Sequence, residues 1–223
     1  MNSEVFKINI GGRELSVEIP HWADNANGEA LVRYGDTMVL ATVVMGSERE
    51  GIDFFPLTVE YEERYYAAGK IRGSRFVRRE GKPSDEAVLN ARLVDRAIRP
   101  RFPKHLKREV QVITTCLSWD GENDPDVLNL LAASIALSVS DIPWNGPVAA
   151  VRVGRVNGQW ILNTTYEARK DSDIDVVFAG GCFPGAVKLG SDFLINMIEG
   201  DFKEVKEEDL LEAAQFVACY SSA

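Results

Sequence analysis

The segment 127–139, VLNLLAASIALSV, places the strongest constraint on the fold, because it is apolar or small on nearly every face of a helix. A helix of that kind has no polar side to turn towards water and must be buried among other elements. Asp124 is a suitable N-cap for it, and Pro125 suits the first helical position. We therefore expect a buried helix that begins at Pro125.

Strands with alternating side chains surround this helix, and tight turns join several of them. Three hairpins are expected, at 5–19 around Gly11-Gly12, at 30–44 around Gly35-Asp36, and at 148–162 around Asn157-Gly158. Further strands are expected at 54–61, 109–118, 174–179 and near 194–198, and further helices at 84–99 and 207–218. This mixture predicts an α+β fold of the β-α-β kind, with mixed sheets packed on helices, in a single domain over residues 1–223.

The charges of the chain are unevenly distributed. The net charge is −9 over 223 residues, yet the segment 70–108 holds 13 Lys and Arg against 4 Asp and Glu. The rest of the chain holds 12 basic against 30 acidic residues. A polyanion responds to the local field, so an acidic protein with one basic segment can still bind nucleic acid there.

Several classes of protein are disfavoured by composition. No apolar run approaches the roughly 20 residues that cross a bilayer, and no secretory signal is visible at the N-terminus. The three cysteines form no metal-spaced pair and suit reduced thiols in a cytosolic protein. Only two histidines are present, which disfavours a histidine-based metal site or a Ser-His-Asp triad.

The helix predicted over 84–99 carries a row of arginines. Arg92, Arg96 and Arg99 are spaced i, i+4 and i+7, and they fall within an arc of roughly 60°. Apolar residues flank that arc on both sides, so we expect the arginines to line a cleft. Guanidinium groups that close together need anions between them, and Asp95 and phosphates are the two candidates.

A glycine-rich, strongly basic loop over 67–83 comes directly before this helix. In it Phe76 stands close to Arg78 and Arg79. Such a pairing suits single-stranded nucleic acid, because the ring stacks on a base while the guanidinium groups contact the backbone. Salt bridges within the fold remain the alternative for each arginine.

Four stretches carry a family resemblance. They are RYYAAGKIRGSRFVRREGKPSDEAVLNARLVDRAIRPRFP (64–103), DFFPLTVEYEER (53–64), NDPDVLNLLAASIALSVSDIPWNGPVAAVRVG (123–154) and DSDIDVVFAG (171–180). These stretches resemble the first core domain of bacterial polynucleotide phosphorylases. The resemblance implies a ribonuclease PH-like fold, also described as ribosomal protein S5 domain 2-like. Enzymes of that family degrade RNA from its 3′ end with phosphate. They contain two such cores, a helical linker, and KH and S1 domains, and they form ring-shaped homotrimers.

The resemblance also implies roles for two groups of residues. The loop group, which matches a Phe-Phe-Arg-Arg loop facing the central RNA channel, is Phe76, Arg78 and Arg79. The helix group, which matches arginines that hold RNA near the active site, is Arg92, Arg96 and Arg99. Val77 replaces the second Phe of the family pattern, so one stacking ring is absent. The segment 180–192 looks like an extension of the usual connection.

Catalysis in the family belongs to the second core, with serines for phosphate and an Asp-x-Asp-x-Lys pattern. The equivalent place here contains Asp173 and Asp175, and Val177 stands where the lysine would be. Valine can neither donate a proton nor stabilise a developing oxyanion. The two carboxylates could hold Mg²⁺, but a structural role at a turn and strand entry is favoured. We expect no catalytic and no metal-binding residue here, and Mg²⁺ and inorganic phosphate only in the full enzyme.

The sequence thus predicts a non-catalytic, RNA-binding first core of a phosphate-dependent 3′-to-5′ exoribonuclease, cytoplasmic and without membrane association. The expected partners are single-stranded RNA and the enzyme's second core, within a homotrimer; the second core, KH and S1 segments are not found in residues 1–223. Two alternatives stay open. One is a stand-alone phosphorolytic nuclease resembling ribonuclease PH, and the other is a structural ring subunit without RNA affinity.

Overall fold

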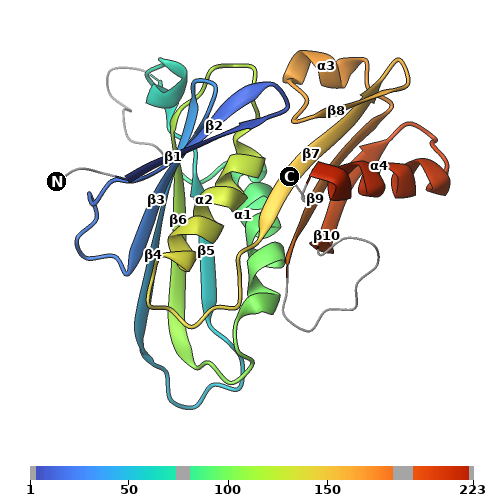
Figure 1. The fold of residues 1–223 in the computed structure, drawn as a ribbon. Coiled ribbons are helices and arrows are strands. Elements are labelled where there is room, and N and C mark those ends of the chain that lie inside the picture. The colour runs from blue at the N-terminus through green and yellow to red at the C-terminus, as the bar shows by residue number, and fades with distance from the viewer. Residues whose placement is uncertain (1–3, 74–80, 183–192, 221–223) are drawn as a thin grey trace.

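The computed structural model describes residues 4–73, 81–182 and 193–220, and these residues form two β-sheets with helices between and beside them (Figure 1). The six-stranded sheet has the order β1 (Glu4–Ile10), β2 (Arg13–Ile19), β3 (Gly28–Tyr34), β4 (Thr37–Glu48), β6 (Arg108–Ser118) and β5 (Leu57–Glu62). The four-stranded sheet has the order β10 (Phe193–Phe202), β9 (Ile174–Cys182), β7 (Ala149–Val156) and β8 (Gln159–Leu162). All strand pairs are antiparallel except β5 with β6.

The α-helices of the described residues are α1 (Asp85–Ile98), α2 (Pro125–Ser138), α3 (Tyr166–Lys170) and α4 (Glu207–Tyr220). Two short 3₁₀ helices, η1 (Tyr65–Ala68) and η2 (Arg99–Arg101), follow β5 and α1. None of the described helices is long and apolar enough to span a membrane.

The main core lies between the two sheets and is filled by α1 and α2. Eleven residues of α2 are buried, which confirms the expectation drawn from its all-round apolar sequence. The core receives Val110 and Val112 from the six-stranded sheet, and Val177 and Ala179 from the four-stranded sheet.

A second, smaller core lies on the other face of the four-stranded sheet. Successive residues of a strand point to opposite faces, so Val176 and Phe178 of β9 pack against Ala213 and Val217 of α4. The protein therefore has four layers: six-stranded sheet, helices α1 and α2, four-stranded sheet, and α4 (Figure 1).

The predicted α+β fold class is confirmed, with two local differences. The strand expected over 54–61 begins only at Leu57, and Phe54 is 64% exposed. Pro56, which has no N–H to give to a neighbouring strand, precedes that start. The short helix α3 was not predicted, because five residues are too few to show helical periodicity.

Candidate nucleic-acid interface

Helix α1 presents its arginines from a well-defined start. The Ser84 side chain accepts a hydrogen bond from the Ala87 N–H at 3.0 Å, as an N-cap does. The same hydroxyl donates to the Glu63 carboxylate at 2.8 Å, which fixes the start of α1 beside the end of β5. One face of the helix is then buried in the core, through residues Ala87, Ala91, Leu93, Val94, Ala97 and Ile98.

Arg92 and Arg96 lie on the outer face of α1 and Arg99 follows in η2, and all three are exposed. The expectation that they line a cleft is therefore wrong. It assumed that both flanks of the arginine row are packed, whereas Val88 and Leu89 are 46% and 60% exposed. At the first turns of α1, fewer of the apolar side chains are buried than the sequence pattern predicts.

Two of the three arginines have carboxylate partners. Arg96 pairs with Glu199 of β10 at 2.7 Å, and Arg99 pairs with Asp95 one turn earlier at 2.7 Å. Arg99 also donates to the backbone oxygens of Phe55 and Leu57, at 3.3 and 3.2 Å. Salt bridges within the fold thus account for Arg96 and Arg99.

Arg92 makes no ion pair within the described part of the chain. The Arg96 pair is exposed, and such pairs contribute only about 0–1 kcal/mol, so a phosphate can exchange for Glu199 at little cost. Arg99 is held more firmly, by both oxygens of Asp95 and by two backbone oxygens. The outer face of α1 therefore offers the unpaired Arg92 and the weakly paired Arg96 to a polyanion.

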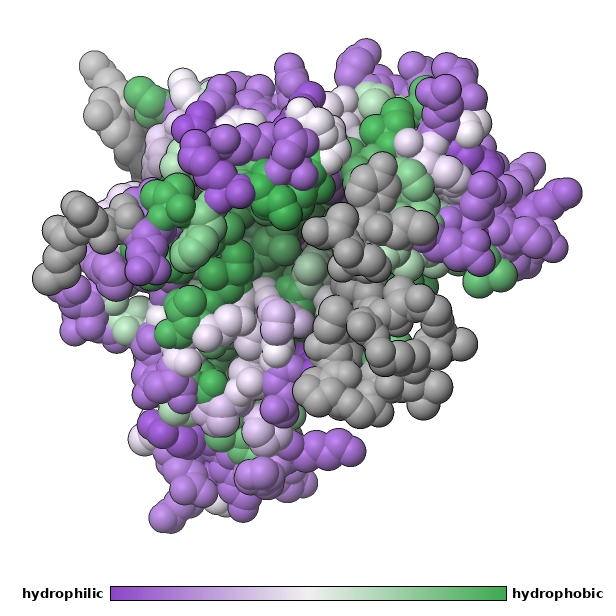
Figure 2. All heavy atoms as spheres, in the orientation of Figure 1, coloured by the Kyte–Doolittle hydropathy of each residue, from purple (hydrophilic) through white to green (hydrophobic). Residues whose placement is uncertain are grey.

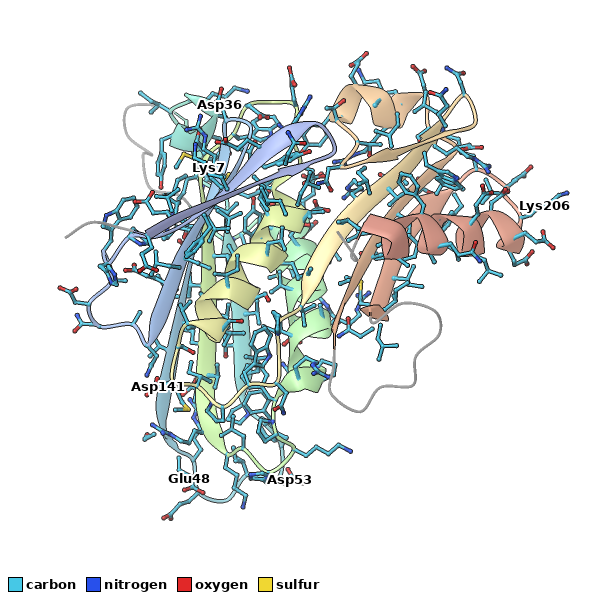
Figure 3. All side chains as sticks on the ribbon, in the orientation of Figure 1. Lys7, Asp36, Glu48, Asp53, Asp141 and Lys206 are labelled. Carbon is cyan, nitrogen blue, oxygen red and sulfur yellow. The ribbon has the colours of Figure 1, made fainter. Side chains whose placement is uncertain are left out.

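Three acidic residues labelled in Figure 3 lie at the ends of the six-stranded sheet. Asp36 is at one end of the six-stranded sheet, and Glu48 and Asp53 are at the other. Phe76, Arg78 and Arg79 of the predicted RNA-binding loop lie outside the described residues, so their contribution stays a prediction.

The two carboxylates considered for Mg²⁺ are both held by arginines of β7. The Asp173 carboxylate accepts hydrogen bonds from two guanidinium nitrogens of Arg155, at 2.7 and 3.0 Å. Both carboxylate oxygens of Asp175 accept hydrogen bonds from the Arg152 guanidinium, each at 2.7 Å. The Arg155 hydrogen bonds lower the pKa of Asp173. The two aspartates are therefore structural partners of these arginines at the entry of β9.

Arg152 also joins a larger buried cluster that contains Asp126 of α2, Asp124 and Arg169. It contacts Asp126 closely and lies 3.5 Å from Asp124, which in turn pairs with Arg169 at 2.7 Å. Burial, followed by the neighbouring Asp124, raises the pKa of Asp126 to about 6. Burial alone would lower the pKa of Arg152, but the surrounding carboxylates raise it. The cluster ties α2 to β7 and α3.

An apolar hollow with a polar rim lies above this cluster, between the β1–β2 hairpin, α2 and β7 (Figure 2). The hollow has a volume of about 30 Å³. Arg152, Arg169 and Thr164 line it, and their Nε, Nη2 and Oγ1 atoms are buried without a hydrogen-bond partner among the described residues.

Among the described residues, no group of three His, Cys, Asp or Glu side chains could hold a metal ion. The arginines that hold the aspartates were not singled out from the sequence. The signal that could have found them is the charged Arg152 and Arg155 inside the apolar strand VRVGRV, since buried arginines need carboxylate partners.

Two family models match this chain one after the other. The description "3′ exoribonuclease family, domain 1" matches residues 11–143, which hold most of the six-stranded sheet with α1 and α2. The chain belongs to the 3′ exoribonuclease family. The "domain 2" model of the same family matches residues 146–216, which hold the four-stranded sheet, α3 and most of α4.

Relatives within the 3′ exoribonuclease family are named polyribonucleotide nucleotidyltransferase. That of Exiguobacterium sibiricum is 50% identical over 94% of this chain. That of Thermomicrobium roseum is 53% identical over 92%, and that of Thermus thermophilus 48% over 95%. This chain spans only 27%, 25% and 28% of those three proteins. It is therefore similar to one ribonuclease PH-like core of a longer protein.

Solved structures of other ribonuclease PH-like proteins share the fold. Rrp46 of rice (Oryza sativa) matches 99% of this chain with a TM-score of 0.69 and 17% identity, over 89% of its own chain. A chain of the Archaeoglobus fulgidus exosome, solved with RNA bound to the active site, matches 92% with a TM-score of 0.69 and 19% identity, over 84% of its own chain. The predicted ribonuclease PH-like fold is confirmed.

Proposed function

We propose that this chain is the RNA-binding, non-catalytic first core of a polyribonucleotide nucleotidyltransferase, an enzyme that degrades RNA from its 3′ end with phosphate. The observation that carries the RNA-binding part is the outer face of α1. Arg92 is exposed there without a carboxylate partner in the described chain, and Arg96 lies one turn away in a weak surface pair. In the proposed function, the loop residues Phe76, Arg78 and Arg79 also bind the RNA.

The non-catalytic part rests on the environment of β9. A phosphorolytic site needs groups that handle a proton and stabilise a developing negative charge. Here Val177 is 2% exposed and apolar, and the nearby Asp173 and Asp175 are each bound to a guanidinium group. Neither aspartate is available to act as an acid or a base.

Mg²⁺ does not fit these two aspartates. A divalent cation needs carboxylate oxygens that are not neutralised, and Arg152 and Arg155 already occupy the oxygens of Asp175 and Asp173 at 2.7–3.2 Å. A cation placed there would also lie beside two positive charges. Mg²⁺ and inorganic phosphate are assigned to the complete enzyme and not to this core.

The remaining assignments follow from the same relatives. Residues 1–223 are proposed to be one domain, which the core shared by both sheets supports. Its partners are single-stranded RNA and the second core of the enzyme, in a homotrimer located in the cytoplasm. A ring assembly of ribonuclease PH-like subunits is consistent with the likeness to an exosome chain.

Fluorescence anisotropy with a labelled single-stranded oligoribonucleotide tests the RNA-binding part. Replacing Arg92 and Arg96 by Ala should weaken binding roughly 2- to 5-fold for each arginine, and equally for all RNA sequences. The slope of log Kd against the logarithm of the salt concentration should decrease by roughly 0.7 for each phosphate contact that is lost. Arg33→Ala is the matched control, because Arg33 is also exposed and ion-paired but lies at the β3–β4 turn.

Two results would contradict the proposal. If the Arg92→Ala, Arg96→Ala variant binds RNA as tightly as the unchanged chain, or if the unchanged chain binds none, the α1 surface has no RNA-binding role. If the 223-residue chain releases nucleoside diphosphates from RNA when phosphate is added, it is a stand-alone nuclease.

A further inference from the structure

Two exposed tyrosines follow one another in η1. Tyr65 and Tyr66 are 47% and 57% exposed. Burial of aromatic rings is among the strongest favourable contributions to folding, so two adjacent rings left on the surface are candidates for contact with another molecule.

The backbone beneath these rings is held firmly. The backbone N–H of Gly69 donates to the backbone oxygen of Tyr66 at 2.9 Å, and the backbone N–H of Lys70 donates to the backbone oxygen of Tyr65 at 3.0 Å. Gly69 adopts the left-handed conformation, with φ of 66°, that such a helix end requires. In addition, the backbone N–H of Trp119 donates to the backbone oxygen of Ala67 at 3.0 Å. These hydrogen bonds fix the backbone that carries the two rings.

Positive charge adjoins the rings. The Arg72 guanidinium lies 5.8 Å from the centroid of the Tyr65 ring, which is a cation–π distance. Lys70 is exposed. Within the described ranges, neither Lys70 nor Arg72 forms an ion pair. The neighbouring carboxylate of Glu62 is instead bound to Arg64.

Helix η1 lies close to the first turns of α1. Ala67 of η1 packs against the small cluster of Tyr61, Ala87, Ala91 and Cys116, in which the two alanines belong to α1. Arg92 follows Ala91 in the sequence, and Arg96 lies about one turn further along α1.

From these contacts we propose that the Tyr65–Tyr66 pair is a base-stacking site for single-stranded RNA. In it, Arg72 and Lys70 contact the phosphates on either side of the stacked base. The inference rests on the proposed RNA-binding function and adds a site for bases to the α1 surface, which has guanidinium groups only. Stacking of this kind tolerates any base, because every base has a π-face.

A ring-deleted variant and abasic RNA together test the site. Replacing both tyrosines by Ala should weaken binding of single-stranded RNA roughly 5- to 150-fold for each base that stacks. Replacing both by Phe keeps the rings and should leave affinity nearly unchanged. The Ala variant should also keep the salt dependence of binding, because no phosphate contact is removed. Abasic RNA should bind the Ala variant and the unchanged chain equally.

The outcomes separate this site from the proposed function. If the α1 arginine variant loses affinity while the tyrosine-to-Ala variant does not, the stacking site is wrong and the RNA-binding function stands. If the unchanged chain binds no RNA, both fail. If the Ala variant binds RNA normally but changes the oligomeric state in size-exclusion chromatography, the rings contact protein, and the stacking site is likewise refuted.

Discussion

The buried Arg152 cluster makes the sharpest prediction about stability. The Arg152 side chain is 13% exposed and serves Asp124, Asp126 and Asp175, whose side chains are 16%, 4% and 23% exposed. Replacing Arg152 by Met keeps most of the side-chain volume, but Arg169 then remains as the cation of the cluster for three carboxylates. Breaking a buried pair in this way costs about 3–5 kcal/mol. For a domain of this size the loss corresponds to roughly 6–20 °C in Tm.

The loss should also depend on pH in a defined direction. The pKa of Asp126 is raised to about 6 in the folded protein, above the unfolded value of about 4. The folded state therefore binds more protons between those values, and its stability rises as pH falls through the folded pKa. Without Arg152 that pKa rises further. The destabilisation of the Arg152→Met variant should therefore be smaller at pH 5 than at pH 8.

Urea denaturation of the 223-residue chain at pH 5 and pH 8 measures both effects. Arg33→Met is the control, since Arg33 and Asp36 form an ion pair with side chains 50% and 77% exposed. It should cost at most about 1 kcal/mol at either pH. If the two variants are equally stable at pH 8, or if the Arg152→Met deficit is the same at both pH values, the cluster does not stabilise the fold as described.

Two further predictions concern α1 and the metal. Ser84→Ala should destabilise the chain by about 1 kcal/mol, because the Ala87 N–H loses its capping acceptor; urea denaturation measures this, and an unchanged midpoint would exclude the cap. Millimolar Mg²⁺ should leave the Tm of this chain unchanged, because Asp173 and Asp175 are already paired with arginines; a clear rise in Tm, reversed by a chelator, would show a metal site.

The elements that the sequence predicts well are those with strong local signals. The all-round apolar pattern of α2 required burial, and its Asp124 cap and Pro125 start are where the structure has them. The Gly11-Gly12 turn likewise joins β1 and β2. Each of these features depends on residues close together in the sequence, so a local pattern suffices.

The surroundings of the charged residues could not be predicted in the same way. Arg96 is paired with Glu199, which lies 103 residues away on β10, and Arg152 meets Asp175 across 23 residues. Which acid meets which base depends on how the sheets pack, and helical spacing does not contain that information. For this reason the row on α1 was expected to face a cleft, although the structure places it on the surface.

The position of α1 connects these observations. The helix packs between the two sheets, and the Arg96–Glu199 pair and a hydrogen bond from Asn196 to the Ala97 oxygen at 3.0 Å join its last turns to β10. Its first turns are joined to η1 through Ala67. The exposed guanidinium groups are therefore carried by a rigid element and not by a loop. A polyanion bound along α1 loses little affinity to ordering of the protein, because the fold has already fixed the spacing of the charges.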